Sequence, residues 1–200
     1  MPRSHVPARR NGVARAARYQ DYKPFLREDF NFSCGYCASW DRFCGGANFF
    51  HVDHFAPKKP FDQLLLEYSN LVYSCPFCNG GKSNKWIGDD PHVSHNGVEG
   101  FVDPCSTEFD LHLDRTGDGR FIALSPVGSY MLRHLRLYLE RHRMLWSIQR
   151  LELIKRRGRE AIRALGRDDP RRTPLLVQLW EVTNEIDDYL DAVFGAPPED

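Results

Sequence analysis

Residues 34–85 contain most of the side chains in this sequence that could bind a metal or move a proton. The Cys-x-x-Cys pairs Cys34/Cys37 and Cys75/Cys78 lie near the two ends of this stretch. Two thiolates three positions apart on a tight turn can bind one ion, and a second pair completes the tetrahedron that zinc favours. Alternatives are a thioredoxin-like redox pair, which belongs beside a βαβ pattern that is absent here, and ordinary buried cysteines. The spacing therefore predicts a structural four-cysteine zinc site.

Between the two cysteine pairs, an acidic residue stands next to a histidine. These residues are Asp53 and His54, and Asn79 directly follows the last cysteine. On an extended backbone, neighbouring side chains point in different directions, so one can bind a metal while the other faces a water molecule. The Asp-His pair can therefore divide metal binding and contact with water between its two side chains.

Three short elements must position these side chains. Residues 49–52 form a β-prone run that leads into Asp53 and His54, and residues 71–73 predict a second strand. A helix can begin at Pro76, because proline is tolerated in the first turn. The sequence therefore predicts a β-β-α unit in which the Asp-His pair and Asn79 converge.

The ordered motifs of this stretch resemble those of the HNH endonuclease family, in the form whose ββα-metal finger is braced by a zinc knuckle. Besides the cysteines, the matching motifs are Asp53-His54 followed by Pro57, Asn70-Leu71, and Asn79-Gly80-Gly81-Lys82. The last of these is also similar to the closing motif in the HNH domain of RNA-guided CRISPR nucleases. The final H of the family name HNH denotes a histidine, and Asn79 occupies that position in this sequence. This substitution is common in the family and affects only the choice of metal.

The resemblance implies a metal-dependent endonuclease that hydrolyses phosphodiester bonds in DNA. His54 is then the general base, which suits an imidazole with an ordinary pKa near ~6.5. Asp53 and Asn79 hold one Mg²⁺ or Mn²⁺ ion, and Asn70 fixes the loop that carries His54. Lysines flanking the site could contact nucleic acid, and these are Lys58, Lys82 and Lys85. The alternative is a zinc-stabilised nucleic-acid-binding module without catalysis, although binding alone has no use for His54.

A looser resemblance extends beyond the motifs. The run from Phe101 to Pro104, through a hairpin and into a Leu/Arg-rich helix, is similar to free-standing HNH proteins of phage-defence loci, including the nuclease subunit of Septu-type systems. This resemblance implies an anti-phage or restriction role and an ATPase as partner protein.

The formal net charge is zero, but the charges are segregated along the sequence. Residues 1–27 and 129–160 are rich in Lys and Arg, whereas residues 175–200 carry acids and no base. Nucleic-acid binding needs a local basic face, not a global excess, so the segregated charges are compatible with a nucleic-acid partner, which is expected to be double-stranded DNA. The sequence shows no signal peptide and no apolar run near the ~18 residues of a membrane span. We therefore expect a cytoplasmic protein that does not bind membranes.

The pattern of elements predicts an α+β fold with three parts. These are a basic N-terminal arm at 1–27, either solvated or lying along phosphates, a zinc-braced HNH domain with a β-hairpin at 28–125, and a helical region at 126–200. The hairpin strands are expected at 109–113 and 120–124. One long amphipathic helix, with Gly158 as a candidate break, and a helix from Thr173 to Gly195 should follow.

Several other His and Cys residues have weaker signals. His51 shares the strand face of Asp53 and is expected to pack against the finger, with metal binding as the alternative. His92 and His95 are three positions apart, but outside a helix this spacing does not predict a metal site. Cys44 and Cys105 have no partner at knuckle spacing and are expected to be ordinary buried thiols.

Overall fold

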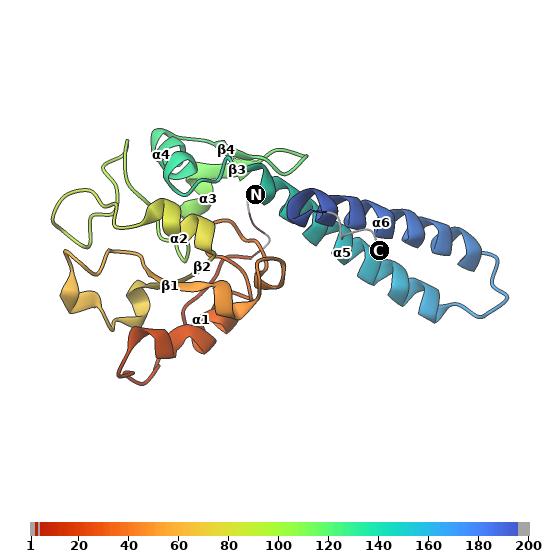
Figure 1. The fold of residues 1–200 in the computed structure, drawn as a ribbon, viewed down its shortest axis with the longest axis horizontal. Helices are drawn as coiled ribbons and strands as arrows, with labels where there is room; N and C mark the ends of the chain where they lie inside the picture. The colour runs from red at the N-terminus through yellow and green to blue at the C-terminus, as the bar shows by residue number, and fades with distance from the viewer. Residues whose placement is uncertain (1–2, 4, 196–200) are drawn as a thin grey trace. The chain divides into compact units, whose positions relative to one another are not determined.

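The computed structural model describes residue 3 and residues 5–195, and the fold is a mixture of helices and small antiparallel sheets (Figure 1). Contacts within the chain divide it into two compact units, residues 1–142 and 143–200. The boundary between these units does not coincide with the expected boundaries at 27/28 and 125/126. The division of the chain into the three expected parts stays a prediction. The outer limits of those parts, residues 1 and 200, lie outside the described residues.

The first sheet and the helix after it form the expected β-β-α unit. Strand β1 (His51–His54) pairs antiparallel with β2 (Leu71–Ser74), and Asp53 lies opposite Val72 in the register. Helix α2 (Pro76–Lys82) follows at once, with Pro in its first turn and the Cys75 sulfur accepting a hydrogen bond from the Cys78 N–H. Helix α1 (Lys23–Asp29) packs on this sheet. Short 3₁₀ helices lie at Tyr19–Tyr22, Asp41–Phe43, Ala47–Phe49, Asp62–Leu64 and Tyr68–Asn70.

The core of the first unit surrounds β2, all four residues of which are buried. It is mainly aromatic and aliphatic, and its fully buried large side chains include Tyr36, Phe50, Tyr73, Phe101, Phe109 and Met131. Gly81 allows α2 to approach helix α4 (Pro126–His134), because a Cβ at this position would lie 2.6 Å from the carbonyl oxygen of His134. The β-β-α unit is therefore held by packing on several sides.

The second sheet is a hairpin, but its first strand begins at Leu113, so the expected strand at 109–113 is wrong. Residues 109–112 form the one-turn helix α3 (Phe109–His112), and strand β3 (Leu113–Arg115) begins only afterwards. Strand β3 pairs with β4 (Phe121–Ala123). A hydrogen bond from the Glu108 N–H to the Ser106 hydroxyl starts a helical turn, and this local bond outweighs the alternating pattern of residues 109–113.

The long helix expected after Pro126 is broken, and Gly158 is not the break. Helix α4 ends at His134, and α5 (Glu140–Ala164) runs through Gly158. Leu135 and Leu137 are both buried, yet residues two positions apart point to different sides of a helix. The chain therefore turns between the helices, with Arg136 at a φ of 57°, so that both leucines reach the core.

In the second unit, α5 is followed by α6 (Arg172–Phe194), which ends at Gly195 as expected. A Cβ at Gly158 would lie 3.6 Å from Leu179, so the two helices pack closely there. Ile186 is buried, whereas Leu176 is 45% exposed. In the part of the chain that the structure describes, no helix has the length and apolar character needed to cross a membrane.

The N-terminal segment is not a free tail where the structure describes it. Arg3 is buried and pairs with Asp110 at 2.7 Å. Arg9 makes two hydrogen bonds to the carboxylate of Asp103 and a third to the carbonyl oxygen of Leu71. These guanidinium groups tie the segment to the folded unit, so the expectation of a solvated tail is wrong for them.

Candidate active site and metal centre

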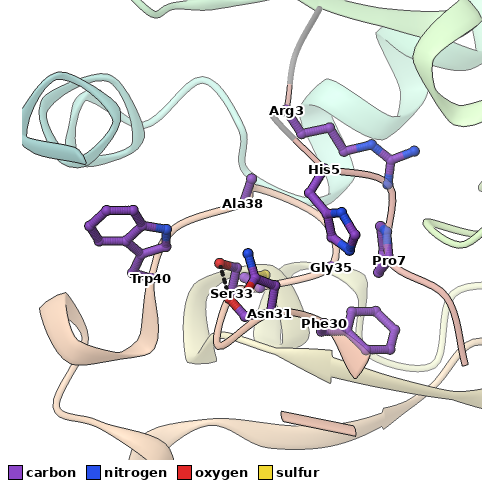
Figure 2. Close-up of a pocket in the computed structure, with 10 residues that line it drawn as sticks. Arg3, His5, Pro7, Phe30, Asn31, Ser33, Gly35, Ala38 and Trp40 are labelled. Atoms are coloured by element: carbon purple, nitrogen blue, oxygen red, sulfur yellow. Dashed lines mark hydrogen bonds between the residues drawn. The ribbon is translucent and has the colours of Figure 1, made fainter. Parts of the chain in front are cut away.

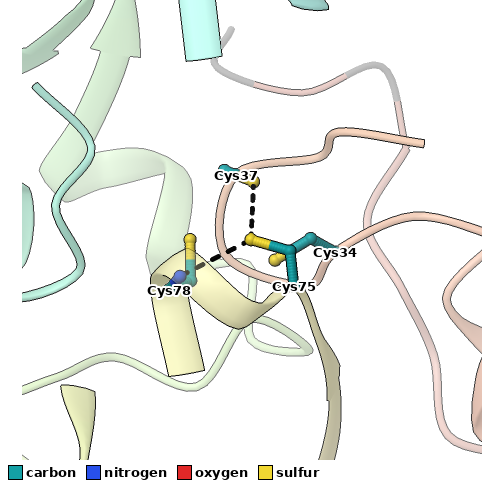
Figure 3. A group of neighbouring side chains, drawn as sticks. All are labelled: Cys34, Cys37, Cys75 and Cys78. Atoms are coloured by element: carbon teal, nitrogen blue, oxygen red, sulfur yellow. Dashed lines mark hydrogen bonds between the residues drawn. The ribbon is translucent and has the colours of Figure 1, made fainter. Parts of the chain in front are cut away.

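The four knuckle cysteines come together as expected (Figure 3). Their sulfur atoms all lie within 4.8 Å of one another, and all four side chains are buried. The Cys37 and Cys75 sulfurs are 3.8 Å apart. A tetrahedral zinc site with Zn–S bonds of ~2.3 Å requires sulfur–sulfur distances of about 3.8 Å. The donor set and its spacing therefore fit a structural zinc ion.

The charge of this cluster also favours a cation. Burial raises the pKa of the Cys78 thiol, and hydrogen bonds with the neighbouring cysteines raise the pKa of Cys75. Four buried thiols cannot all ionise together unless a positive ion balances them.

Asp53 is buried and held through one of its two carboxylate oxygens. The Tyr36 hydroxyl donates to Oδ2 at 2.7 Å, and Nζ of Lys82 lies 3.4 Å from the same oxygen. Burial, together with the Asp53 charge, raises the pKa of Tyr36, so the phenol keeps the proton that it donates. Oδ1 has no hydrogen-bonding partner among the described residues and remains available to a ligand.

His54 has a defined tautomer. Its Nε2 lies 3.0 Å from the carbonyl oxygen of Leu65. A carbonyl can only accept, so Nε2 carries the proton of the neutral ring and Nδ1 is left with a free lone pair. The edge of the Tyr19 ring also contacts the imidazole, with ring centroids 4.7 Å apart. Burial lowers the pKa of His54 below its ordinary value, so the neutral form prevails at neutral pH.

Asn70 braces the loop after β1. Its side-chain Oδ1 accepts from the Ala56 N–H at 2.8 Å, and its Nδ2 donates to the Ala56 carbonyl at 3.0 Å. The backbone N–H of Phe55 also donates to the Asn70 carbonyl oxygen. Asn70 thus satisfies the buried backbone that immediately follows His54.

Asp53, His54 and Asn79 line one cavity of about 290 Å³. Exposed Lys58 lies on its wall, where Nζ donates to the Tyr19 hydroxyl at 3.3 Å. His51 also lines the cavity and is exposed, so the expectation that it packs against the finger is wrong.

Two of the three lysines expected at a nucleic-acid surface are wholly or partly buried. Lys82 is fully buried, and its ammonium donates to the His54 carbonyl oxygen at 2.7 Å besides pairing with Asp53. This burial does not fit the expected contact with nucleic acid. Lys85 is half-buried and donates to the Gly81 carbonyl oxygen at 2.7 Å.

A smaller cavity, of about 30 Å³, lies beside the first knuckle (Figure 2). The N-terminal segment forms one of its walls, and its other walls come from residues 30–40. This volume can hold a water molecule but no substrate. The larger cavity around Asp53 is therefore the better candidate for chemistry.

Sequence reasoning missed several groups of this site. Tyr19, Tyr36 and the Leu65 carbonyl oxygen each contact Asp53 or His54. The position of Tyr36 inside the first Cys-x-x-Cys pair was the one available signal. The Leu65 carbonyl has no signature in the sequence, because any residue can supply it.

Comparison with known proteins agrees with this arrangement. Residues 34–85 match the family model described as HNH endonuclease. The chain thus contains an HNH endonuclease domain, as the motifs indicated, with the four-cysteine cluster at its ends. No curated protein and no solved structure matches the chain. The domain indicates a nuclease-type or nucleic-acid-binding function.

Proposed function

We propose that the protein is a metal-dependent endonuclease that hydrolyses phosphodiester bonds in DNA. The observation that carries the proposal is that Asp53, His54 and Asn79 line a single cavity. Each supplies a different need of phosphodiester hydrolysis. His54 is the proton acceptor, and Asp53 and Asn79 provide oxygen ligands for a divalent ion.

The donor set fits Mg²⁺ or Mn²⁺. Oδ1 of Asp53 is left without a partner among the described residues while Oδ2 is held by Tyr36 and Lys82, and Asn79 lines the same cavity. A charged and a neutral oxygen donor suit a hard ion that keeps several of its waters. When bound, such an ion supplies positive charge that stabilises the phosphorane and the leaving oxygen.

His54 acts as general base through Nδ1. The Leu65 carbonyl oxygen fixes the ring and keeps the proton on Nε2, so Nδ1 is the ring nitrogen that can take a proton from the attacking water. The lowered pKa keeps this nitrogen unprotonated at neutral pH. Asn70 holds the loop that follows, which limits the movement of His54.

Lys58 is the best-placed group for a phosphate contact, because it is exposed and lies on the cavity wall. Lys85 could make a similar contact after exchanging its bond to Gly81. Contacts of this kind recognise the backbone and not the bases, so sequence preference should be weak. Double-stranded DNA as the substrate, an ATPase partner, an anti-phage role and a cytoplasmic location stay predictions.

A plasmid-nicking assay with Mg²⁺ or Mn²⁺ tests the proposal, with EDTA as the metal-free arm. His54→Ala should bind DNA like the wild type and cleave roughly 100- to 10,000-fold more slowly, the range for loss of a positioned base. His92→Ala is the matched control, because His92 is exposed and lies outside the cavity. DNA binding by the wild type without cleavage in either metal would support the non-catalytic module instead. Loss of cleavage in His51→Ala with full activity in His54→Ala would instead assign the general base to His51.

A further inference from the structure

A cluster of metal-binding side chains lies outside the HNH site. His95, Glu108 and His112 each offer one ligand atom, and these atoms all lie within 4.8 Å of one another. Nε2 of His95 is 3.2 Å and Nε2 of His112 is 3.3 Å from the same oxygen of Glu108. None of these residues lines the cavity around Asp53. We propose that His95, Glu108 and His112 form a second metal site, of the zinc class, that fastens the 83–108 segment to α3.

The spacing of the cluster suits a tetrahedral ion. Bonds of ~2.0–2.2 Å from zinc to nitrogen and oxygen place neighbouring ligand atoms about 3.3–3.5 Å apart. The observed distances, 3.2 Å for His95 and 3.3 Å for His112, lie just below this range and at its lower end, and both exceed the ~2.7–2.9 Å of a hydrogen bond between charged partners. In the four-cysteine cluster, the distance of 3.8 Å between the Cys37 and Cys75 sulfurs likewise equals the separation that tetrahedral Zn–S bonds require.

The backbone positions the three ligands before any ion binds. Glu108 and His112 are four residues apart, so they share one face of the turn that forms α3. His95 is held by a bridge to Gly100, whose φ of 119° and close approach to the His95 backbone leave no room for a side chain. The Asn96 side chain closes the same turn by accepting from the Val98 and Glu99 N–H groups. The site is therefore built from a closed loop and a helical turn.

His112 also has the outer hydrogen bond that metal-binding histidines usually make. Its Nδ1 lies 2.6 Å from the Ser125 hydroxyl, which also accepts from the Gly128 N–H as the N-cap of α4. A bond at Nδ1 orients the ring and directs Nε2 toward the ion. For His95, Nε2 faces Glu108, and Nδ1 is buried without a hydrogen-bonding partner among the described residues.

The donor types and exposure select the class of metal. Two imidazoles and one carboxylate suit zinc and similar transition metals, whereas Mg²⁺ and Ca²⁺ prefer oxygen ligands alone. The exposed fraction of the side chain is 25% for His95, 46% for Glu108 and 15% for His112, so an ion can enter from solvent. Three protein ligands leave one position for water.

Zinc titration of the full-length protein tests this site. After mild chelation that leaves the cysteine-bound zinc in place, calorimetry in excess Mg²⁺, which fills the proposed Asp53 site, should show one further equivalent of Zn²⁺ bound. Cobalt substitution separates the two sites, because only the cysteine cluster gives a strong thiolate charge-transfer band. His95→Ala and Glu108→Gln should lose the added equivalent and keep that band, and His92→Ala, in the same loop, should bind like the wild type. Ser125→Ala should weaken binding by roughly 10- to 100-fold.

A thiolate charge-transfer band that persists in a variant also shows that the variant is folded. Glu108→Gln should fold well, because glutamine has the size of glutamate and the position is partly exposed. The proposal is overturned if the wild type binds no added Zn²⁺, or if His95→Ala and Glu108→Gln both bind it unchanged. The cluster would then be a hydrogen-bonded His-Glu-His group. Neither result bears on the nuclease proposal, since the two sites share no residue.

Discussion

Replacing Asn70 with alanine should lower the stability of the protein by an amount that the structure allows us to estimate. The Asn70 side chain makes one hydrogen bond to the Ala56 N–H and another to the Ala56 carbonyl oxygen. Ala56 is only 1% exposed, so water cannot readily replace either bond. A buried polar group left unpaired costs about 1–3 kcal/mol, and two of them give about 2–6 kcal/mol. This is a large part of the ~5–15 kcal/mol that stabilises an ordinary domain.

Equilibrium unfolding in urea, followed by circular dichroism, measures this loss. Asn84→Ala is the matched control, because it makes the same chemical change at an exposed position and should alter stability by less than ~0.5 kcal/mol. Asn70→Asp should lose at least as much stability as Asn70→Ala at neutral pH, because a buried carboxylate oxygen would replace the group that donates to the Ala56 carbonyl oxygen. A loss below ~0.5 kcal/mol in Asn70→Ala would refute the view that Asn70 satisfies this loop.

Two further predictions concern protonation and the zinc centre. Because burial lowers the pKa of His54, the cleavage rate should fall as pH drops through an inflection below the ordinary ~6.5 and should be level above it. An inflection above that value, in steady-state rates corrected for metal binding, would contradict a lowered pKa of the general base. Cys75→Ser should lose the thiolate-bound metal and most of its thermal stability, since binding energy at a structural zinc is folding energy. Cys105→Ser, outside the cluster, should keep both, and equal metal content in the two variants would rule out the four-cysteine site.

The parts of the site that could be predicted from sequence are those in which spacing fixes geometry locally. Two Cys-x-x-Cys pairs can close on one ion whatever surrounds them, and the four sulfurs do come together. The strands at residues 51–54 and 71–74 and the helix from Pro76 follow from β-prone runs and a proline in the first turn. The pairing of the two strands, and the helix that follows the second strand after Cys75 alone, bring Asp53 and Asn79 to one cavity.

The parts that could not be predicted depend on distant partners. The sequence predicts a surface position for Lys82, because lysine side chains usually lie at the surface. In the structure, the Asp53 carboxylate and the His54 carbonyl oxygen hold the Lys82 ammonium in the interior. His95 had no signal beyond its neighbour His92, and its actual partners lie 13 and 17 positions further along the sequence at Glu108 and His112. Hydrophobic periodicity likewise missed the turn between α4 and α5, since it cannot show that two leucines must enter the same core.

Tyr36 connects the zinc centre to the proposed catalytic centre. It lies between Cys34 and Cys37 in the first knuckle, and its hydroxyl donates to Oδ2 of Asp53. Any ion held by the cysteines fixes the backbone on both sides of this tyrosine, and the tyrosine in turn fixes which oxygen of Asp53 is left for a catalytic ion. Lys82, at the end of the helix that carries the second knuckle, contacts the same Asp53 oxygen. Both cysteine pairs therefore position Asp53 through one residue each, so the structural metal would govern catalysis by geometry without taking part in the reaction.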